Sequence, residues 1–462
     1  MGIIAGFMVP HPPMIVPDIG RGSEAQVEET TRAYERVADE IAALCPETIV
    51  ITSPHSIMYA DWFHVSPGVK ATGSFAFFRV PNVTFSEEYD TELVAEICRL
   101  AKEADFPAGT EGERDKALDH GTMVPLWFIR NKYKGGKIVR IGLSGLPLTD
   151  HYKLGMLIKE AAENLDRKTV IVASGDQSHK LQEYGPYGYV PEGPEYDERI
   201  MDVMGRAAFD ELFDFNEGFC DRAAECGHRS FVIMAGAFDG QEVKAERLSH
   251  QDVTGVGYGI CTFYPEGASD DCRYLEARLS KMEAELTARR EQSDEYVKLA
   301  YAAVDAWVSK RDTIPVPEGL PDEMLTRRAG TFVSIHKHGA LRGCIGTIGP
   351  TQNSIAEEII ENAKSASTRD PRFAPIQTAE LPYLEITVDV LGEAEDIDSE
   401  AELDVKRYGV IVTKGYRRGL LLPDLEGVDT SAQQVGIALM KAGLAEDETD
   451  FILERFEVIR HT

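Results

Sequence analysis

Apolar runs and amphipathic helical stretches alternate along the first half of the chain. Helical stretches at residues 23–45 and 151–165 separate strand-like runs, and such repetition predicts an α/β domain with a mostly parallel sheet flanked by helices. A further strand-like run ends near residue 265, so we place this domain at residues 1–265. The strand-like runs are residues 2–9, 48–53, 137–143, 169–175 and 257–265.

The pattern changes after residue 265. Residues 266–289 are charged and helical with few turn signals, which predicts a solvated linker helix rather than a coiled-coil partner. Strand-like runs follow at residues 330–350, 384–392 and 409–423, with helices between and after them. This pattern predicts a smaller α+β domain over residues 290–462.

Composition indicates a globular protein of more than one domain. A chain of 462 residues is too long to fold around one ordinary hydrophobic core. Its content of 43% hydrophobic and 27% charged residues is typical of soluble globular proteins. No apolar run approaches the roughly 18 residues of a membrane span, and no signal peptide is evident, so we expect a cytoplasmic protein. The net charge of −30 argues against nucleic acid and anionic membranes as partners. The seven cysteines form no CxxC pair, which argues against a disulfide framework and a thiolate zinc site.

Three histidines follow the ends of three separate predicted strands. His11 comes after residues 2–9, His55 follows "TIVITS", and His179 follows "TVIVAS". Ligands bind at the carboxyl ends of strands in open α/β sheets. If these strands are neighbours, the three imidazoles converge on one spot.

Two further positions belong to the same hypothesis. His120 stands in "LDHGTMVPL", where a loop enters a helix, and Glu225 stands in "AECGHRS" at the head of an apolar helix. Two imidazoles and a carboxylate form the facial triad of non-haem Fe(II) oxygenases, and the same set serves zinc hydrolases. The HExxH signature of zinc proteases is absent. Each residue also has a structural alternative: a turn, a hydrogen bond from His179 to Asp176, or a favourable charge from Glu225 at a helix start.

The motifs "VPHPPMIVPDIG", "SPHS", "LDHGTMVPL", "SGDQSH" and "AECGHRS" together resemble class III extradiol ring-cleavage dioxygenases of the LigB-like kind, and within them the Memo-type proteins. The resemblance covers about residues 1–265. It implies His11, His55 and Glu225 as metal ligands. It also implies His179 as acid/base, His120 in the substrate pocket and Asp176 orienting His179.

The resemblance leaves the third ligand open. Cys226 adjoins Glu225, and Memo-type relatives place a cysteine here, so Cys226 is the alternative ligand. The implied function is a non-haem Fe(II)-dependent extradiol-type dioxygenase that takes O2 and a small catecholic or related aromatic substrate. One alternative is a metal-binding component of a multi-protein modification system, without ring cleavage and with a radical SAM partner. The other is a zinc or manganese hydrolase.

The second half resembles a different family. "LRGCIGTIGP", "SASTRDPRFAPI" and "LEITVDVLG" are similar to the AMMECR-type domain, over about residues 290–462. Cys344 is either a nucleophile beside Arg342 or a small buried strand residue, and we favour the buried residue. Arg342, Arg369 and Asp370 either line a cleft or form structural ion pairs. The family resemblance of the first half also raises the expectation of a homo-oligomer.

Overall fold

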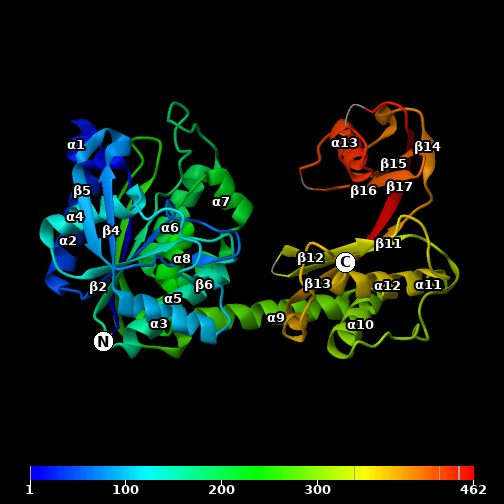
Figure 1. The fold of residues 1–462 in the computed structure, drawn as a ribbon, viewed down its shortest axis with the longest axis horizontal. Coiled ribbons are helices and arrows are strands. Elements are labelled where there is room, and N and C mark those ends of the chain that lie inside the picture. Colours follow the sequence, from blue (N-terminus) through cyan, green and yellow to red (C-terminus); the bar gives the residue numbers. More distant parts are fainter. Residues whose placement is uncertain (1, 338, 426, 446–447) are drawn as a thin grey trace. The chain divides into compact units, whose positions relative to one another are not determined.

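The computed structural model describes residues 2–337, 339–425, 427–445 and 448–462, and it divides into two compact units. Unit 1 is Met1–Leu279 and unit 2 is Ser280–Thr462 (Figure 1). The division falls within the helix α9 (Tyr274–Gln292), which contains most of the predicted linker. No helix in the described parts of the chain is long and apolar enough to cross a membrane.

Unit 1 is built on a six-stranded mixed sheet in the order β7-β2-β8-β1-β10-β9. The pairs β7–β2, β2–β8 and β8–β1 are parallel, whereas β1–β10 and β10–β9 are antiparallel. The prediction of a mostly parallel sheet holds for the first four strands and misses the antiparallel edge. The strands are β1 (Ile3–Val9), β2 (Thr48–Ser53), β7 (Lys137–Gly142), β8 (Thr169–Ser174), β9 (Gln241–Gln251) and β10 (Tyr258–Ala268).

Alternate residues of the central strands pack into two cores, because successive side chains of a strand point to opposite faces. Phe7 of β1 packs with Tyr34 and Val37 of α2, on the face that α2 and α4 cover. Met8 packs in the other core with α3, α5 and α8. The helices are α1 (Pro17–Gly20), α2 (Glu28–Leu44), α3 (Thr91–Glu103), α4 (His120–Lys132), α5 (Leu148–Asn164), α6 (Glu192–Arg206), α7 (Glu217–Ala223) and α8 (His228–Gly236). Four further strands lie outside the main sheet: β3 (Phe63–His64), β4 (Lys70–Phe75), β5 (Val80–Glu88) and β6 (Ala108–Gly109).

Unit 2 is an antiparallel sheet with helices packed on it, in the order β12-β11-β13-β17-β15-β16, with β14 paired to β17. Its core joins α10 and α12 to β11 and β13, and a second cluster joins α13 to β15. The strands are β11 (Thr331–Lys337), β12 (Ala340–Gly346), β13 (Leu384–Leu391), β14 (Glu395–Ile397), β15 (Tyr408–Lys414), β16 (Arg417–Leu421) and β17 (Ile452–His461). The helices are α10 (Glu295–Lys310), α11 (Asp322–Thr326), α12 (Ile355–Thr368) and α13 (Ser431–Lys441).

The "RGCIG" segment lies on β12, where α12 approaches closely. A Cβ at Gly343 would lie 2.2 Å from the carbonyl oxygen of Ala366, so helix and strand can meet only over a glycine. Cys344 is partly buried, its sulfur accepts a hydrogen bond from Ser334 Oγ at 3.3 Å, and its N–H donates to Asp370 Oδ2 at 2.9 Å.

The charged residues singled out near Cys344 are engaged in unit 2. Asp370 pairs with Arg372 at 2.7 Å, and Arg342 pairs with Glu380 at 3.0 Å. The backbone N–H of Arg369 donates to the carbonyl of Ser365 at the end of α12. The geometry therefore favours structural ion pairs for Arg342 and Asp370.

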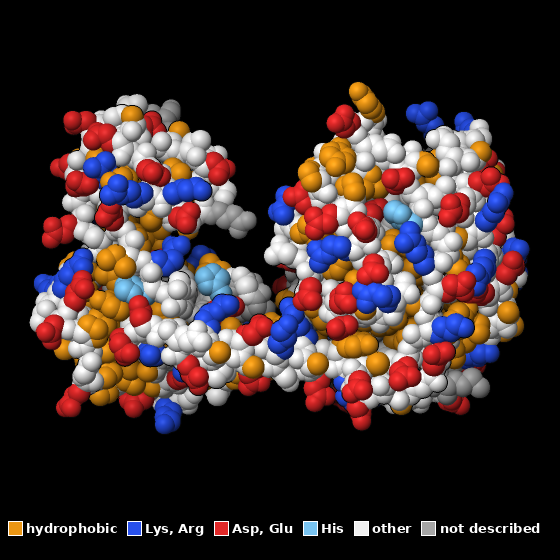
Figure 2. All heavy atoms as spheres, turned by 180° about the vertical axis from the view of Figure 1, so that it is seen from behind, with side chains coloured by type: hydrophobic (Ala, Val, Ile, Leu, Met, Phe, Trp, Pro, Cys, Tyr) orange, Lys and Arg blue, Asp and Glu red, His pale blue; other side chains and the backbone are white. Residues whose placement is uncertain are grey.

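The negative charge is spread over the surface. On the face shown in Figure 2, Lys and Arg side chains of each unit are interspersed among Asp and Glu rather than gathered in one patch. The excess of 78 acidic over 48 basic residues therefore produces a mixed surface with a negative bias on this face.

Candidate metal centre

The strand order of unit 1 brings the predicted histidines together. The strands β2, β8 and β1 are neighbours in the sheet and run parallel, so their carboxyl ends lie at one edge. His11 follows β1 and His55 follows β2, and the rings of the two residues meet edge to face with centroids 4.7 Å apart. His11 is 1% exposed, whereas His55 is exposed, so solvent reaches the pair from the His55 side.

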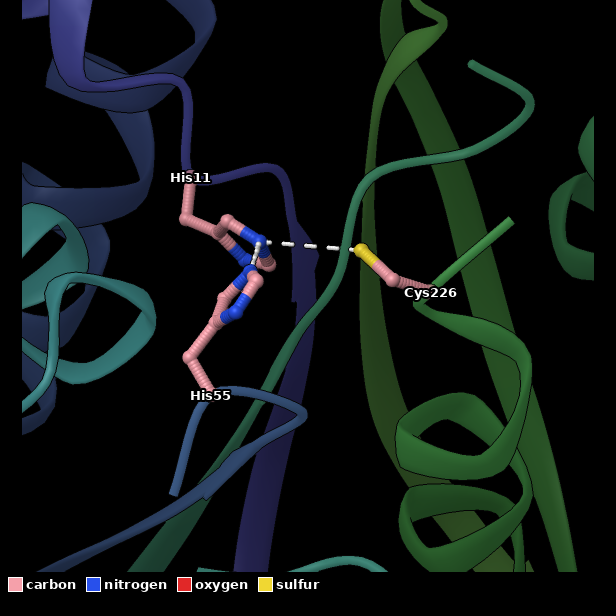
Figure 3. Close-up of side chains that lie close together, drawn as sticks. All are labelled: His11, His55 and Cys226. Carbon is pink, nitrogen blue, oxygen red and sulfur yellow. Dashed lines mark hydrogen bonds between the residues drawn. The ribbon is translucent and has the colours of Figure 1, made fainter. Parts of the chain in front are cut away.

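The Nε2 atoms of the two imidazoles face each other. His11 Nε2 lies 2.9 Å from His55 Nε2, as Figure 3 shows, with the Cys226 sulfur facing them. His11 Nδ1 lies 3.0 Å from Ser174 Oγ, and that hydroxyl already donates its proton to the carbonyl of Gly121 at 2.6 Å. Ser174 Oγ must therefore accept from His11 Nδ1–H, which leaves His11 Nε2 unprotonated. This arrangement is the one in which a histidine binds a metal through Nε2.

Cys226, not Glu225, joins the histidine pair. Its Sγ lies 3.6 Å from His11 Nε2, and His11, His55 and Cys226 offer ligand atoms that all lie within 4.8 Å of one another. Glu225 instead accepts a hydrogen bond from the N–H of His228, the first residue of α8, at 2.6 Å. Neighbouring residues in this loop point in different directions, so the geometry favours the alternative third ligand over the predicted carboxylate.

Glycines let the two loops that carry the site approach each other. A Cβ at Gly175 would lie 2.1 Å from the Cα of Gly227, so the loop after β8 can reach the loop before α8 only without a side chain. A reciprocal pair of contacts then joins them: Cys226 N–H donates to the Asp176 carbonyl, and Asp176 N–H to the Cys226 sulfur, both at 3.3 Å. These contacts fix the sulfur opposite His11.

His120 starts α4 beside the pair. Its ring centroid lies 4.0 Å from that of His55 and 5.5 Å from that of His11. Asp119 is the N-cap of α4 and accepts from Thr122 N–H at 3.0 Å, which fixes where the helix begins. Asp119 also accepts from Ser53 Oγ at 2.5 Å and so connects the start of α4 to the end of β2.

A cavity of about 320 Å³ opens beside these residues. His179 lies on its wall, and its Nε2 is buried without a hydrogen-bond partner among the described residues. The ring of Tyr187 stacks on that of His179, with the ring centroids 5.2 Å apart. Asp176 accepts a hydrogen bond from the backbone N–H of His11 at 2.7 Å. This bond connects the loop that follows β8, which carries His179, to the segment that carries His11. The other lining residues are Pro12, Pro13, Met14, Pro186, Thr254, Val256 and Tyr258.

Comparison with known proteins identifies both halves of the chain. The family model described as "Catalytic LigB subunit of aromatic ring-opening dioxygenase" matches residues 5–261. The chain belongs to the LigB family. The AMMECR1 family model matches residues 297–461, so both resemblances found in the sequence are confirmed.

Relatives of this LigB protein share its two-part organisation or one half of it. Protein CA_C1420 of Clostridium acetobutylicum is 40% identical over 469 residues, covering 100% of this chain and 99% of that protein. A Thermotoga maritima protein is 48% identical over 167 residues, which is 36% of this chain and 96% of that protein.

Two solved structures of uncharacterized proteins were also matched. The Pyrococcus horikoshii protein is 30% identical with a TM-score of 0.35, over 37% of this chain and 91% of its own. The Escherichia coli K12 protein is 16% identical with a TM-score of 0.37, over 56% of this chain and 99% of its own.

The electrostatics of the LigB site keep its imidazoles neutral. Burial lowers the pKa of His11 well below its usual value, and the neighbouring His55 and His120 lower it further. Burial also lowers the pKa of His55, His120 and His179, although Asp176 partly offsets this at His179. Burial raises the pKa of the Cys226 thiol, and the charges of Asp176 and Glu225 raise it further. Neutral imidazoles can coordinate a cation, and a cation would displace the thiol proton of Cys226.

Four other histidines of the LigB domain make contacts away from this donor set. His228 Nε2 lies 3.0 Å from the carbonyl oxygen of Leu212. Burial lowers the pKa of His228 to about 4. His151 contacts Pro147, His64 contacts Glu111 and His250 contacts Asp197.

Sequence reasoning missed Ser174 and Tyr187. Ser174 is the last residue of β8 and is fully buried, so it could not be distinguished from the other strand residues. Tyr187 stands in a loop without periodicity, and only its place between glycines in "YGPYGYV" marks it. Neither residue could therefore be recognised as part of the site from one sequence.

Ser174→Ala is expected to weaken metal binding about tenfold, because His11 loses the partner that fixes its tautomer. Zn²⁺ affinity measured by competition with a chelating dye checks this. Ser178→Ala is the matched control, since Ser178 is also buried and its hydroxyl donates to Ala223 at 2.8 Å, away from His11. Equal affinities for the two variants would contradict the role of Ser174.

Proposed function

We propose that the LigB domain is a metal-dependent oxygenase of the extradiol type, acting with O2 on a catecholic or related small aromatic substrate. The observation that carries the proposal is the pair of Nε2 atoms 2.9 Å apart, one of them unprotonated, at the wall of a cavity that also holds an unpartnered imidazole. His11, His55 and Cys226 would hold the ion. Fe(II) is the metal we propose, since it supplies both a Lewis acid and a reductant for O2.

Other residues of the cavity would take part in proton transfer and substrate binding. His179 is neutral because burial lowers its pKa, its side chain lines the cavity and its Nε2 has no hydrogen-bond partner among the described residues, so it can take a proton from a substrate hydroxyl. Asp176 raises the pKa of His179 and thereby strengthens it as a base. His120, beside His55, can donate a hydrogen bond to substrate oxygen atoms. The prolines and Val256 of the cavity wall provide apolar surface for an aromatic ring.

His179→Gln tests the base. Catechol-dependent O2 uptake by anaerobically purified, Fe(II)-loaded protein is expected to fall about 100-fold, because glutamine cannot accept the proton. Iron content, measured on the same samples, is expected to stay at the wild-type level because His11, His55 and Cys226 are intact. Wild-type protein without O2 uptake on any catechol, or a His179→Gln variant as active as wild type, would contradict the oxygenase proposal.

A second candidate, a zinc or manganese hydrolase on the same residues, is favoured by one observation. The third donor is a thiol, and two imidazoles with a sulfur are a set that zinc accepts readily. Metal analysis after anaerobic purification separates the two candidates, since the hydrolase would retain zinc or manganese and the oxygenase iron.

A third candidate function is metal binding without ring cleavage. Iron bound in full occupancy without O2 uptake would indicate a metal-binding component of a larger modification system. A radical SAM protein is the partner that we propose for such a system.

A further inference from the structure

The metal centre contains a second group of three possible metal donors. Asp176, His179 and Cys226 offer one ligand atom each, and these atoms all lie within 4.8 Å of one another. The group shares only Cys226 with the first set of His11, His55 and Cys226. The two sets therefore meet at one sulfur atom.

An independent observation indicates that this second group lacks a partner. His179 Nε2 is buried and makes no hydrogen bond among the described residues, although a buried imidazole nitrogen normally has one. The same side chain lines the cavity. One carboxylate oxygen of Asp176 accepts from His11 N–H at 2.7 Å, which leaves its other oxygen available.

The donors match a particular class of ion. Sulfur, nitrogen and oxygen together suit a borderline divalent ion such as Zn²⁺ or Co²⁺. Ligand bonds of about 2.0–2.3 Å place tetrahedral donors roughly 3.3–3.8 Å apart. Donor atoms already within 4.8 Å reach that spacing with side-chain movements of an ångström or less.

We infer that the LigB domain binds a second divalent ion at Asp176, His179 and Cys226, with the Cys226 thiolate bridging the two ions. Each ion brings two positive charges against one shared thiolate and one carboxylate, so the ions repel each other. The second ion therefore binds more weakly than the first, by at least about tenfold.

The second ion also has a consequence that rests on the proposed function. An ion on His179 Nε2 occupies the nitrogen that would accept the substrate proton. Excess Zn²⁺ therefore inhibits the oxygenase without displacing the first ion. The stoichiometry itself does not depend on that activity, so failure of the one leaves the other testable.

Cobalt titration of the full chain tests the second site. The wild type is expected to bind two Co²⁺ per chain by equilibrium dialysis at moderate salt, with the second equivalent shifting the sulfur-to-cobalt charge-transfer band. Spin coupling through the shared sulfur is expected to weaken the EPR signal per ion. Asp176→Asn and His179→Gln are each expected to bind one ion and to retain the charge-transfer band of the first equivalent.

The control is Glu225→Gln, an acidic residue next to Cys226 that belongs to neither group and should bind two ions. Cys226→Ala should weaken both equivalents. A wild type that saturates at one ion, a second equivalent without effect on the sulfur band, or a His179→Gln variant that still binds two would overturn the second site. His179→Gln decides the question alone if Asp176→Asn fails to fold.

Discussion

His11→Ala is expected to lower the affinity of the LigB domain for a divalent first-row metal about 1,000-fold, or ~4 kcal/mol. His11 is the only buried imidazole of its donor set, and its Nε2 is the atom that lies close to both other donors, 2.9 Å from His55 and 3.6 Å from Cys226. Removing it leaves two donors, of which one is exposed. Metal analysis and isothermal titration with Zn²⁺ measure the loss.

The fold is expected to survive this change. His11 follows β1 rather than lying within it, and the hydrogen bond from its backbone N–H to Asp176 does not need the imidazole, so we expect the variant to keep it. Circular dichroism and urea unfolding check that point. His228→Gln serves as the comparison, because His228 is equally buried but contacts Leu212 instead of the donor set. Stoichiometric metal in folded His11→Ala protein would show that the ion lies elsewhere.

Cys226→Ala and Glu225→Gln are expected to separate the two candidates for the third ligand. Alanine at 226 removes the sulfur from the donor set, and we expect a loss of affinity of at least about 100-fold. Glutamine at 225 keeps an oxygen that can accept from His228 N–H, so α8 keeps its N-terminal contact and metal affinity stays within about twofold of wild type.

The sulfur also has a spectroscopic signature. The wild type loaded with Co²⁺ should show a sulfur-to-metal charge-transfer band that Cys226→Ala lacks and Glu225→Gln retains. The opposite result, with the band unchanged in Cys226→Ala and affinity lost in Glu225→Gln, would restore the carboxylate as the ligand. The loop would then have to rotate about 225–226 on binding the ion.

The sequence predicted the strands and the convergence of the histidines for a physical reason. Long apolar runs such as Thr48–Ser53 and Thr169–Ser174 are buried on both faces and therefore carry a strong signal. The residue that follows such a strand lies at a known edge of the sheet. His11 and His55 could be placed from that rule alone.

The antiparallel edge of the sheet gave no such signal. Along β9 exposed and partly buried side chains alternate, and its sequence "QEVKAERLSHQ" contains few apolar residues. A polar edge strand is protected against pairing with other chains, and the same polarity hides it from hydrophobic patterning.

The choice between Glu225 and Cys226 could not be made from sequence because it depends on loop direction. Residues that are neighbours along an irregular loop can point to unrelated places. Here the close approach of Gly175 and Gly227, together with the paired contacts of Asp176 and Cys226, sets that direction. All these contacts join segments about fifty residues apart, which no local pattern describes.

The position of β1 in the sheet constrains how the protein is made. β1 is hydrogen-bonded to β8 on one side and to β10 on the other, although Met8 and its β10 neighbour Cys261 lie far apart along the chain. A nascent chain shorter than Ala268 lacks part of that second neighbour. Long-range pairing of this kind is slow to form, so β1 completes its hydrogen bonding on both sides only after β10 has been synthesised. The donor set of His11, His55 and Cys226 is therefore expected to form only after most of the first domain has been translated.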